Sequence, residues 1–194
     1  MSKVLIAIFA ALVPAAATAA DAYTIDPIHS SVNFKVDHLG LAMIHGRFGK
    51  FNGKFTIDRA AKTGGADLSI ETASVDTGDN DKGSRPRSRD EHLRTADFFN
   101  AAEFPRMTFK SSRVVFTGET PSAIEGNFTL LGVTRPVTLQ LVRFKCNPAT
   151  ATAKERCGGD ARGTLKRSEF GMKRGIPNIG DDIALEIGFE ADKD

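Results

Sequence analysis

The stretch Val32-Asn33-Phe34-Lys35-Val36-Asp37-His38 alternates apolar and polar side chains with a period of two. Successive side chains of a β-strand point to opposite faces, so this pattern predicts a strand with one buried face and one solvated face. The same alternation recurs in residues 51–58, 124–128, 137–141 and 183–190. Weaker candidates are residues 67–75, 107–116 and 161–167. We therefore expect about eight or nine antiparallel strands.

The spacing of these stretches defines the fold class. Gly, Asp and Pro turns separate the strands, and no stretch shows the strand–helix–strand rhythm of a parallel sheet. This organisation predicts one all-β domain, either a barrel or a sandwich. Residues 77–94 break the rhythm with many charges of both signs. There Ser88 with Glu91 three residues later forms a capping box, which predicts a short helix beginning near Arg89.

The first nineteen residues have the layout of a secretory signal peptide. Lys3 precedes an apolar run over residues 4–13, Pro14 ends it, and small residues follow. Ala17-Thr18-Ala19 predicts cleavage before Ala20, which leaves residues 20–194 as the mature domain, periplasmic or secreted. The alternative is a membrane anchor, but the run is short and no stop-transfer charges follow it.

The two cysteines, Cys146 and Cys157, flank a loop-like segment that joins two strands. In an exported chain, disulfides persist. We expect these two residues to form a disulfide. A zinc site is the alternative, but no further cysteine or nearby histidine completes a ligand set, and no metal is expected.

Charge and motifs exclude several functions. Removal of Lys3 with the signal peptide lowers the net charge from +2 to +1. Such a nearly neutral chain lacks the excess positive charge that attracts nucleic acid or an anionic membrane. No stable membrane insertion is expected. The chain lacks the hydrolase elbow, the phosphate-binding loop, the dinucleotide fingerprint and the His-Glu-x-x-His motif. Nothing in these patterns argues for catalysis.

The aromatic composition is strongly biased, with fourteen Phe, one Tyr and no Trp. Phe carries no polar group that needs a partner once buried, whereas Tyr and Trp do. This bias predicts a dry interior. It is either an ordinary packed core or the lining of a site for a long apolar ligand.

A few polar residues could contact the polar end of such a ligand. His38 continues the inward register of Val32, Phe34 and Val36, although an inward histidine is more often a core residue. Arginines are suited to phosphate or carboxylate groups. They occur in two basic groups, at residues 85–89 and 166–174. Acidic neighbours could equally neutralise the first group.

Several motifs resemble those of the YceI-like family. Their likeness spans essentially the whole mature chain, and five motifs follow one another in the expected order. They comprise residues 23–30 with 32–38 and 46–48, residues 89–94 with 98–99, residues 104–105 with 109–111, residues 126–134, and residues 167–172. Glu169 departs from the pattern, where the family more often has Asp, but the exchange keeps the carboxylate.

The resemblance implies a single lipocalin-like antiparallel β-barrel of about eight strands, usually periplasmic. It also implies a long apolar tunnel that holds a polyisoprenoid such as a quinone or prenyl lipid, in a carrier or storage role without enzymatic activity. No cofactor other than this bound lipid is expected.

The candidate ligand-binding residues combine inward strand positions with possible head-group contacts. The positions expected to line the tunnel are Phe34, Val36, Phe51, Phe55, Phe109, Phe128, Phe170 and Phe189. The candidates for the head group are His29, His38, Arg89 and Arg167.

Two other functions stay open at this point. One is an enzyme acting on a quinone or prenyl lipid, with His38, His29 or Asp90 as acid or base. The other is a stress-linked partner protein whose barrel is fully packed and holds no ligand. A homodimer through a strand edge or a surface is compatible with lipid binding and with both of these alternatives.

Overall fold

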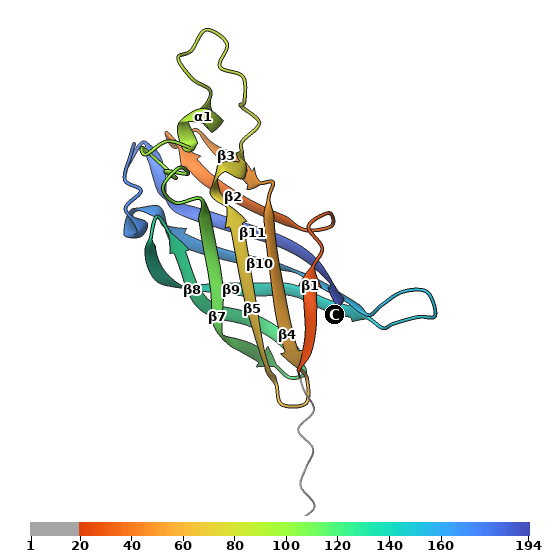
Figure 1. The fold of residues 1–194 in the computed structure, drawn as a ribbon. Helices are drawn as coiled ribbons and strands as arrows, with labels where there is room; N and C mark the ends of the chain where they lie inside the picture. The colour runs from red at the N-terminus through yellow and green to blue at the C-terminus, as the bar shows by residue number, and fades with distance from the viewer. Residues whose placement is uncertain (1–19) are drawn as a thin grey trace, which may run out of the picture.

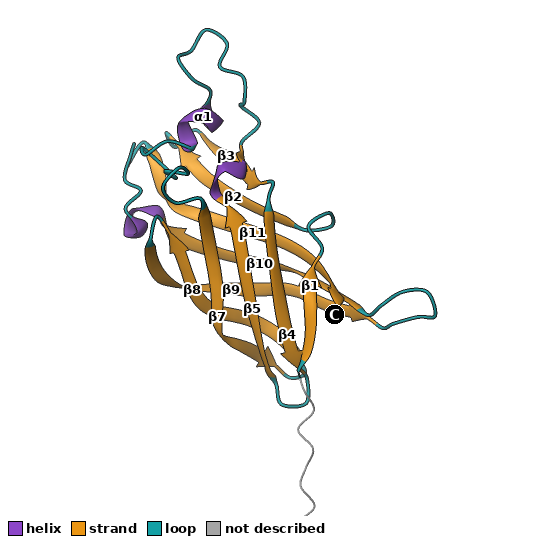
Figure 2. Ribbon diagram, in the orientation of Figure 1, coloured by secondary structure: helices purple, strands orange, loops and turns teal. Residues whose placement is uncertain are grey.

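The computed structural model describes residues 20–194, which form eleven antiparallel strands and almost no helix (Figure 1, Figure 2). The strands are β1 (Asp21–Ile25), β2 (Ser31–His38), β3 (Ala42–Phe48), β4 (Phe51–Asp58), β5 (Thr63–Glu71), β6 (Val75–Asp76), β7 (Arg106–Thr117), β8 (Thr120–Leu130), β9 (Val133–Asn147), β10 (Arg156–Lys166) and β11 (Ile179–Lys193). The helix α1 spans Arg89–Leu93, and two 3-10 turns span Thr72–Ser74 and Arg167–Phe170. The predicted signal peptide, residues 1–19, lies outside the described residues.

Eight strands close into a barrel. They follow the order β1-β4-β5-β7-β8-β9-β10-β11, and β1 pairs back with β11 through Tyr23–Lys193, Thr24–Asp192 and Ile25–Ala191. The earlier part of β11 pairs with β2 instead, which carries β3 and β6. The predicted all-β barrel is therefore confirmed, and the sandwich is excluded.

A bulge interrupts the strict alternation of the long strand β9. In β9 the pairing with β10 shifts between Leu141 and Arg143, so Val142 is an extra residue in the strand. The inward positions change from Val137, Leu139 and Leu141 to Phe144. An extra residue in a bulge reverses the faces of everything that follows. The bulge therefore keeps the apolar residues of β9 inside along the length of the barrel.

The predicted helix α1 begins at Arg89. Ser88 Oγ accepts a hydrogen bond from the Glu91 N–H at 3.1 Å, and the Ser88 N–H donates to Glu91 Oε2 at 2.8 Å. This reciprocal pair satisfies two N–H groups that the helix itself leaves free. The chain after α1 then returns across one end of the barrel, where it buries Phe98 and Phe99.

The other end of the barrel is fixed by the predicted disulfide, which is confirmed. Cys146 and Cys157 lie directly opposite each other on β9 and β10 and are bonded. Cys157, Tyr23 and Ala191 are completely buried in a small apolar cluster at this end. The cross-link therefore reinforces the region in which β1 closes onto β11.

We predict that the double substitution Cys146→Ser/Cys157→Ser lowers the free energy of unfolding by about 2–3 kcal/mol. The disulfide restricts a loop with a sequence separation of 11, and this is the loss expected from the loop entropy of the unfolded chain. Urea denaturation of the oxidised protein and the variant measures it. A change below about 0.5 kcal/mol would contradict the assigned role.

Arg167 organises the loop that connects β10 to β11. Its side chain is 2% exposed, and its guanidinium donates hydrogen bonds of 2.8–3.0 Å to the carbonyl oxygens of Met172, Arg174, Ile179 and Gly180. Four of its five N–H donors are thereby used. Burial lowers the pKa of this guanidinium, and the charge of a nearby carboxylate opposes that shift.

Arg167→Met should destabilise the fold by about 3 kcal/mol or more, because it leaves buried carbonyl groups without donors. The matched control is Lys166→Met, one residue earlier, whose ammonium forms a half-exposed pair with Asp182 at 2.8 Å. Such a surface pair contributes little to stability. Equal losses for the two variants in urea denaturation would refute the structural role of Arg167.

Candidate functional site

The barrel interior holds two apolar cavities. The Phe55 cavity lies toward the disulfide end and is lined by residues that include Ile25, Phe51, Phe55, Phe144, Leu141 and Phe189. The Phe99 cavity lies toward α1 and is lined by residues that include Phe34, Val36, Phe48, Phe98, Phe99 and Phe128. Side chains from strands all around the barrel line both of them.

The two cavities adjoin each other in the middle of the barrel. Five residues line both of them: Val32, Leu68, Phe109, Leu139 and Ile187. The centre of a water-sized sphere can occupy about 90 Å³ in the Phe55 cavity and about 110 Å³ in the Phe99 cavity. One water needs about 10–15 Å³ by this measure. The interior is therefore under-filled by its own side chains.

Aromatic contacts hold the walls of the cavities in place. Phe55 stacks on Tyr23 with ring centroids 4.7 Å apart and meets the edge of Phe189 at 5.8 Å. At the other end, Phe48 meets Phe99 edge-on at 5.5 Å. These are favourable arrangements for aromatic pairs. The rings thus form fixed walls around the space instead of collapsing into it.

Few polar side chains line the cavities, and two of them are already bonded. Asn33 Nδ2 donates to Ser31 Oγ at 3.0 Å, and Arg167 is bonded to backbone carbonyls as described above. Within residues 20–194, every fully buried side-chain nitrogen or oxygen has a hydrogen-bond partner. The interior therefore offers an apolar surface and leaves no buried polar atom that requires a polar ligand.

Most of the predicted tunnel residues line these cavities. Phe51, Phe55, Phe109 and Phe189 line the Phe55 cavity, and Phe34, Val36, Phe109 and Phe128 line the Phe99 cavity. Phe170 lies behind this wall instead, 1% exposed, with its ring edge-on to Phe128 at 5.7 Å. Their predicted contact with a ligand stays a prediction.

The four head-group candidates do not come together. Arg167 lines the Phe99 cavity, but His38 and Arg89 line neither cavity. His29 lies on an exposed loop, with its Nδ1 2.7 Å from Asp26 Oδ2. Arg89 donates from Nε to Thr77 Oγ1 at 2.7 Å. The structure therefore presents no converged head-group site built from these residues.

The first basic group is largely neutralised by acidic neighbours. The Arg85 guanidinium bonds both oxygens of Asp79 at 2.6 and 2.8 Å, and this contact lowers the pKa of the Asp79 carboxyl to about 2. Arg87 lies 3.7 Å from Asp97. These side chains behave as solvated pairs and not as an anion receptor.

Four phenylalanines at the cavities were not among the predicted residues: Phe48, Phe98, Phe99 and Phe144. The bulge at Val142 takes Phe144 out of the period-two register of residues 137–141, so alternation could not identify it. Phe98 and Phe99 lie outside any strand, although their position after the capped helix was a usable signal. Phe48 ends β3 and shares the inward face of Gly46.

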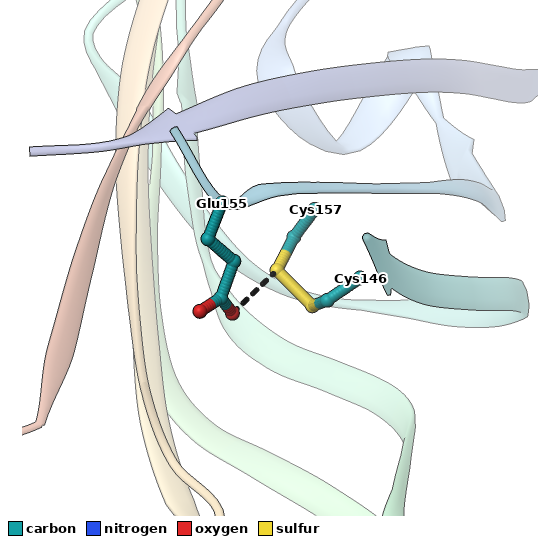
Figure 3. Close-up of side chains that lie close together, drawn as sticks. All are labelled: Cys146, Glu155 and Cys157. Carbon is teal, nitrogen blue, oxygen red and sulfur yellow. Dashed lines mark hydrogen bonds between the residues drawn. A yellow bond between two sulfur atoms is a disulfide. The ribbon is translucent and has the colours of Figure 1, made fainter. Parts of the chain in front are cut away.

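Glu155 forms a small cluster with the Cys146–Cys157 disulfide (Figure 3). Glu155 Oε1 lies 3.8 Å from Cys157 Sγ, but a disulfide sulfur carries no hydrogen and donates no hydrogen bond. Arg59 Nη2 donates to Glu155 Oε1 at 3.0 Å, and Tyr23 Oη donates to the same oxygen at 2.7 Å. The Tyr23 hydrogen bond lowers the pKa of the Glu155 carboxyl. With its thiolates consumed in the disulfide, the cluster is structural.

No helix among residues 20–194 has the length and apolar character needed to cross a membrane.

Comparison with known proteins identifies relatives along nearly the whole chain. A UPF0312 protein of Azotobacter vinelandii is 35% identical over 188 residues, covering 95% of this chain and 94% of the relative. Protein YceI of Escherichia coli is 38% identical over 181 residues, covering 90% and 87%.

Solved structures share the fold. The Campylobacter jejuni YCEI protein superposes with a TM-score of 0.68 at 27% identity, covering 82% of this chain and 91% of that protein. A domain from Saccharophagus degradans, described as polyisoprenoid binding, superposes with a TM-score of 0.63 at 18% identity, covering 90% and 99%. The sequence profile of the YceI-like domain matches residues 23–191. By these matches and by its barrel, the chain belongs to the YceI-like family.

Proposed function

We propose that this protein binds a polyisoprenoid or another long-chain lipid, such as a quinone or prenyl lipid, inside its barrel. The lipid chain would extend through the Phe55 and Phe99 cavities, and the protein would carry or store it without chemical change. The signal-peptide pattern of residues 1–19 supports action in the periplasm or outside the cell.

The observation that carries this proposal is the under-filled apolar interior. The two cavities share five lining residues, so one narrow chain could contact both. Inward residues such as Leu141, Ile187 and Phe189 are only half-buried although they face the barrel axis. Apolar surface left accessible in this way gains free energy when an apolar ligand covers it. A fully packed core without a ligand would not leave it uncovered.

An enzyme acting on such a lipid receives less support. An acid–base mechanism needs titratable groups at the reacting atoms. Asp90, one candidate, is buried but accepts hydrogen bonds from the Thr77 N–H and hydroxyl at 2.9 and 2.5 Å. His29 lies just before β2 and His38 is the last residue of β2, so the two histidines are at opposite ends of this strand. Among the described residues, these candidates form no acid–base pair at either cavity.

The printed description of the Saccharophagus domain as polyisoprenoid binding also supports this ligand class. Specific recognition of a polar head group would need a set of polar side chains around it. The candidate head-group residues do not form such a set here. We therefore propose that recognition rests on the apolar chain, with head groups of different chemistry tolerated.

We predict that Leu141→Trp weakens retention of a prenylquinone about tenfold or more. Leu141 lines the Phe55 cavity, and the larger ring would occupy space that the ligand needs. The experiment incubates the purified protein with the quinone, separates free quinone by gel filtration and measures the quinone retained per protein.

The neighbouring Val142→Trp is the matched control, because Val142 is 58% exposed on the outer face of the same strand. It should retain quinone like the parent protein. Thermal unfolding checks that both variants are folded at the assay temperature. If the parent retains no quinone, or if the two variants retain equal amounts, the proposed interior site is wrong.

A further inference from the structure

The hairpin between β2 and β3 ends in exposed aliphatic side chains. Leu39 is 51% exposed, Leu41 is 82% exposed and Met43 is 45% exposed. Single exposed apolar residues are ordinary on protein surfaces, but a group of them marks an interaction site. The three side chains belong to one short turn and the first residues of β3, so they form such a group.

The backbone conformation of this turn is unfavourable for a leucine at position 39. The His38 carbonyl accepts a hydrogen bond from the Leu41 N–H at 3.1 Å, and Leu39 and Gly40 both have left-handed φ values, +61° and +66°. Turns of this kind favour Asn or Gly at the first position, because a branched apolar side chain is strained there. Leu39 thus costs stability and still leaves half of its surface exposed. A local rule broken without an internal gain points to a functional role.

The turn lies beside the rim of the Phe99 cavity. The Leu39 N–H donates to the Asn178 carbonyl at 2.7 Å, which joins the turn to the loop before β11 (Figure 1). Ile176 of that loop is 36% exposed and extends the apolar group. Val36 of β2, just before the turn, and Ile179, just after the loop, both line the Phe99 cavity. We call Leu39, Leu41, Met43 and Ile176 the apolar tip.

Cations flank the apolar tip. Lys173 and Arg174 are exposed in the same loop as Ile176, and neither forms an ion pair within residues 20–194. Two carboxylates also lie in this region, and a hydrogen bond from His92, helped by the Arg174 charge, lowers the pKa of the Asp97 carboxyl. Asp37 Oδ1 accepts the Gly40 N–H at 2.9 Å, and Asp97 Oδ2 lies 2.8 Å from His92 Nε2.

We propose that the apolar tip inserts into the interfacial layer of a lipid bilayer and docks this end of the barrel on the membrane. The aliphatic side chains would enter the boundary between head groups and acyl chains, and Lys173 and Arg174 would face anionic head groups. With a net charge of only +1 in residues 20–194, apolar insertion supplies most of the attraction. The protein is held at the surface and does not span the bilayer.

A bilayer suits this surface better than a second copy of the chain. A stable protein interface takes about 20–30 residues on each side, whereas the apolar tip has four. Its residues project from a hairpin turn and a loop instead of lining a groove. Insertion of a small convex group into a deformable layer needs no matching partner surface. If the cavities hold a lipid, this docking would bring the Phe99 cavity next to the membrane that contains it.

The test is flotation of the purified protein with vesicles of phosphatidylethanolamine and phosphatidylglycerol. Leu39→Asn/Leu41→Ser should weaken vesicle binding about a hundredfold, since each inserted leucine contributes roughly tenfold. Asn suits the left-handed position of residue 39, so the variant should keep its fold. The matched control is Ile28→Ser, since Ile28 is 84% exposed in the loop at the opposite end of β2 and should leave binding unchanged.

Three outcomes would overturn the proposal. The first is that the parent protein does not bind these vesicles. The second is that the Ile28 and Leu39/Leu41 variants lose vesicle binding equally. The third is that the parent protein sediments as a dimer and binds no vesicles, whereas the Leu39/Leu41 variant sediments as a monomer. The readout is vesicle binding and not lipid retention. Failure here would therefore leave the proposed interior site intact, and failure of the quinone assay would leave the docking intact.

Discussion

The whole architecture depends on the pairing of β1 with the end of β11, which spans only three residue pairs. Such a short ladder contributes little alone, and its surroundings reinforce it. Tyr23 and Ala191, one from each strand, are fully buried together with Cys157 of the disulfide. Lys193 Nζ lies 2.7 Å from Asp21 Oδ1, and the Asp194 N–H donates to the Ala22 carbonyl at 2.9 Å. The closed end is thus held by apolar packing, a covalent bond and charges at one place.

The closed barrel encloses more space than its inward side chains fill. An eight-stranded barrel is just wide enough for side chains to fill or for one small ligand to occupy. Here the rings of Phe55, Phe144 and Phe189 contact one another at centroid distances of 5.8–6.4 Å and form a wall. The space beside that wall continues to the Phe99 cavity. This division between a rigid, cross-linked end and an under-filled interior is the physical basis for assigning a binding role.

The sequence predicted the parts of this structure that follow local rules. The alternation of residues 32–38 specified the inward face of β2, the Ser88–Glu91 capping box specified the start of α1, and the cysteine spacing specified the disulfide. It failed where tertiary geometry overrides periodicity. The bulge at Val142 hid Phe144, and Phe170, a candidate for the tunnel lining, lies behind Phe128. Arg167 was expected at a ligand head group, yet the loop after Met172 folds around its guanidinium, which no local pattern reveals.

We propose that an apolar lipid occupies the barrel interior in the living cell. Native mass spectrometry of the protein purified from its own host, without detergent, tests this claim most directly. We expect a species heavier than the polypeptide by the mass of one long-chain lipid, with the increment lost after organic extraction. A spectrum that repeatedly shows the bare polypeptide alone would contradict it.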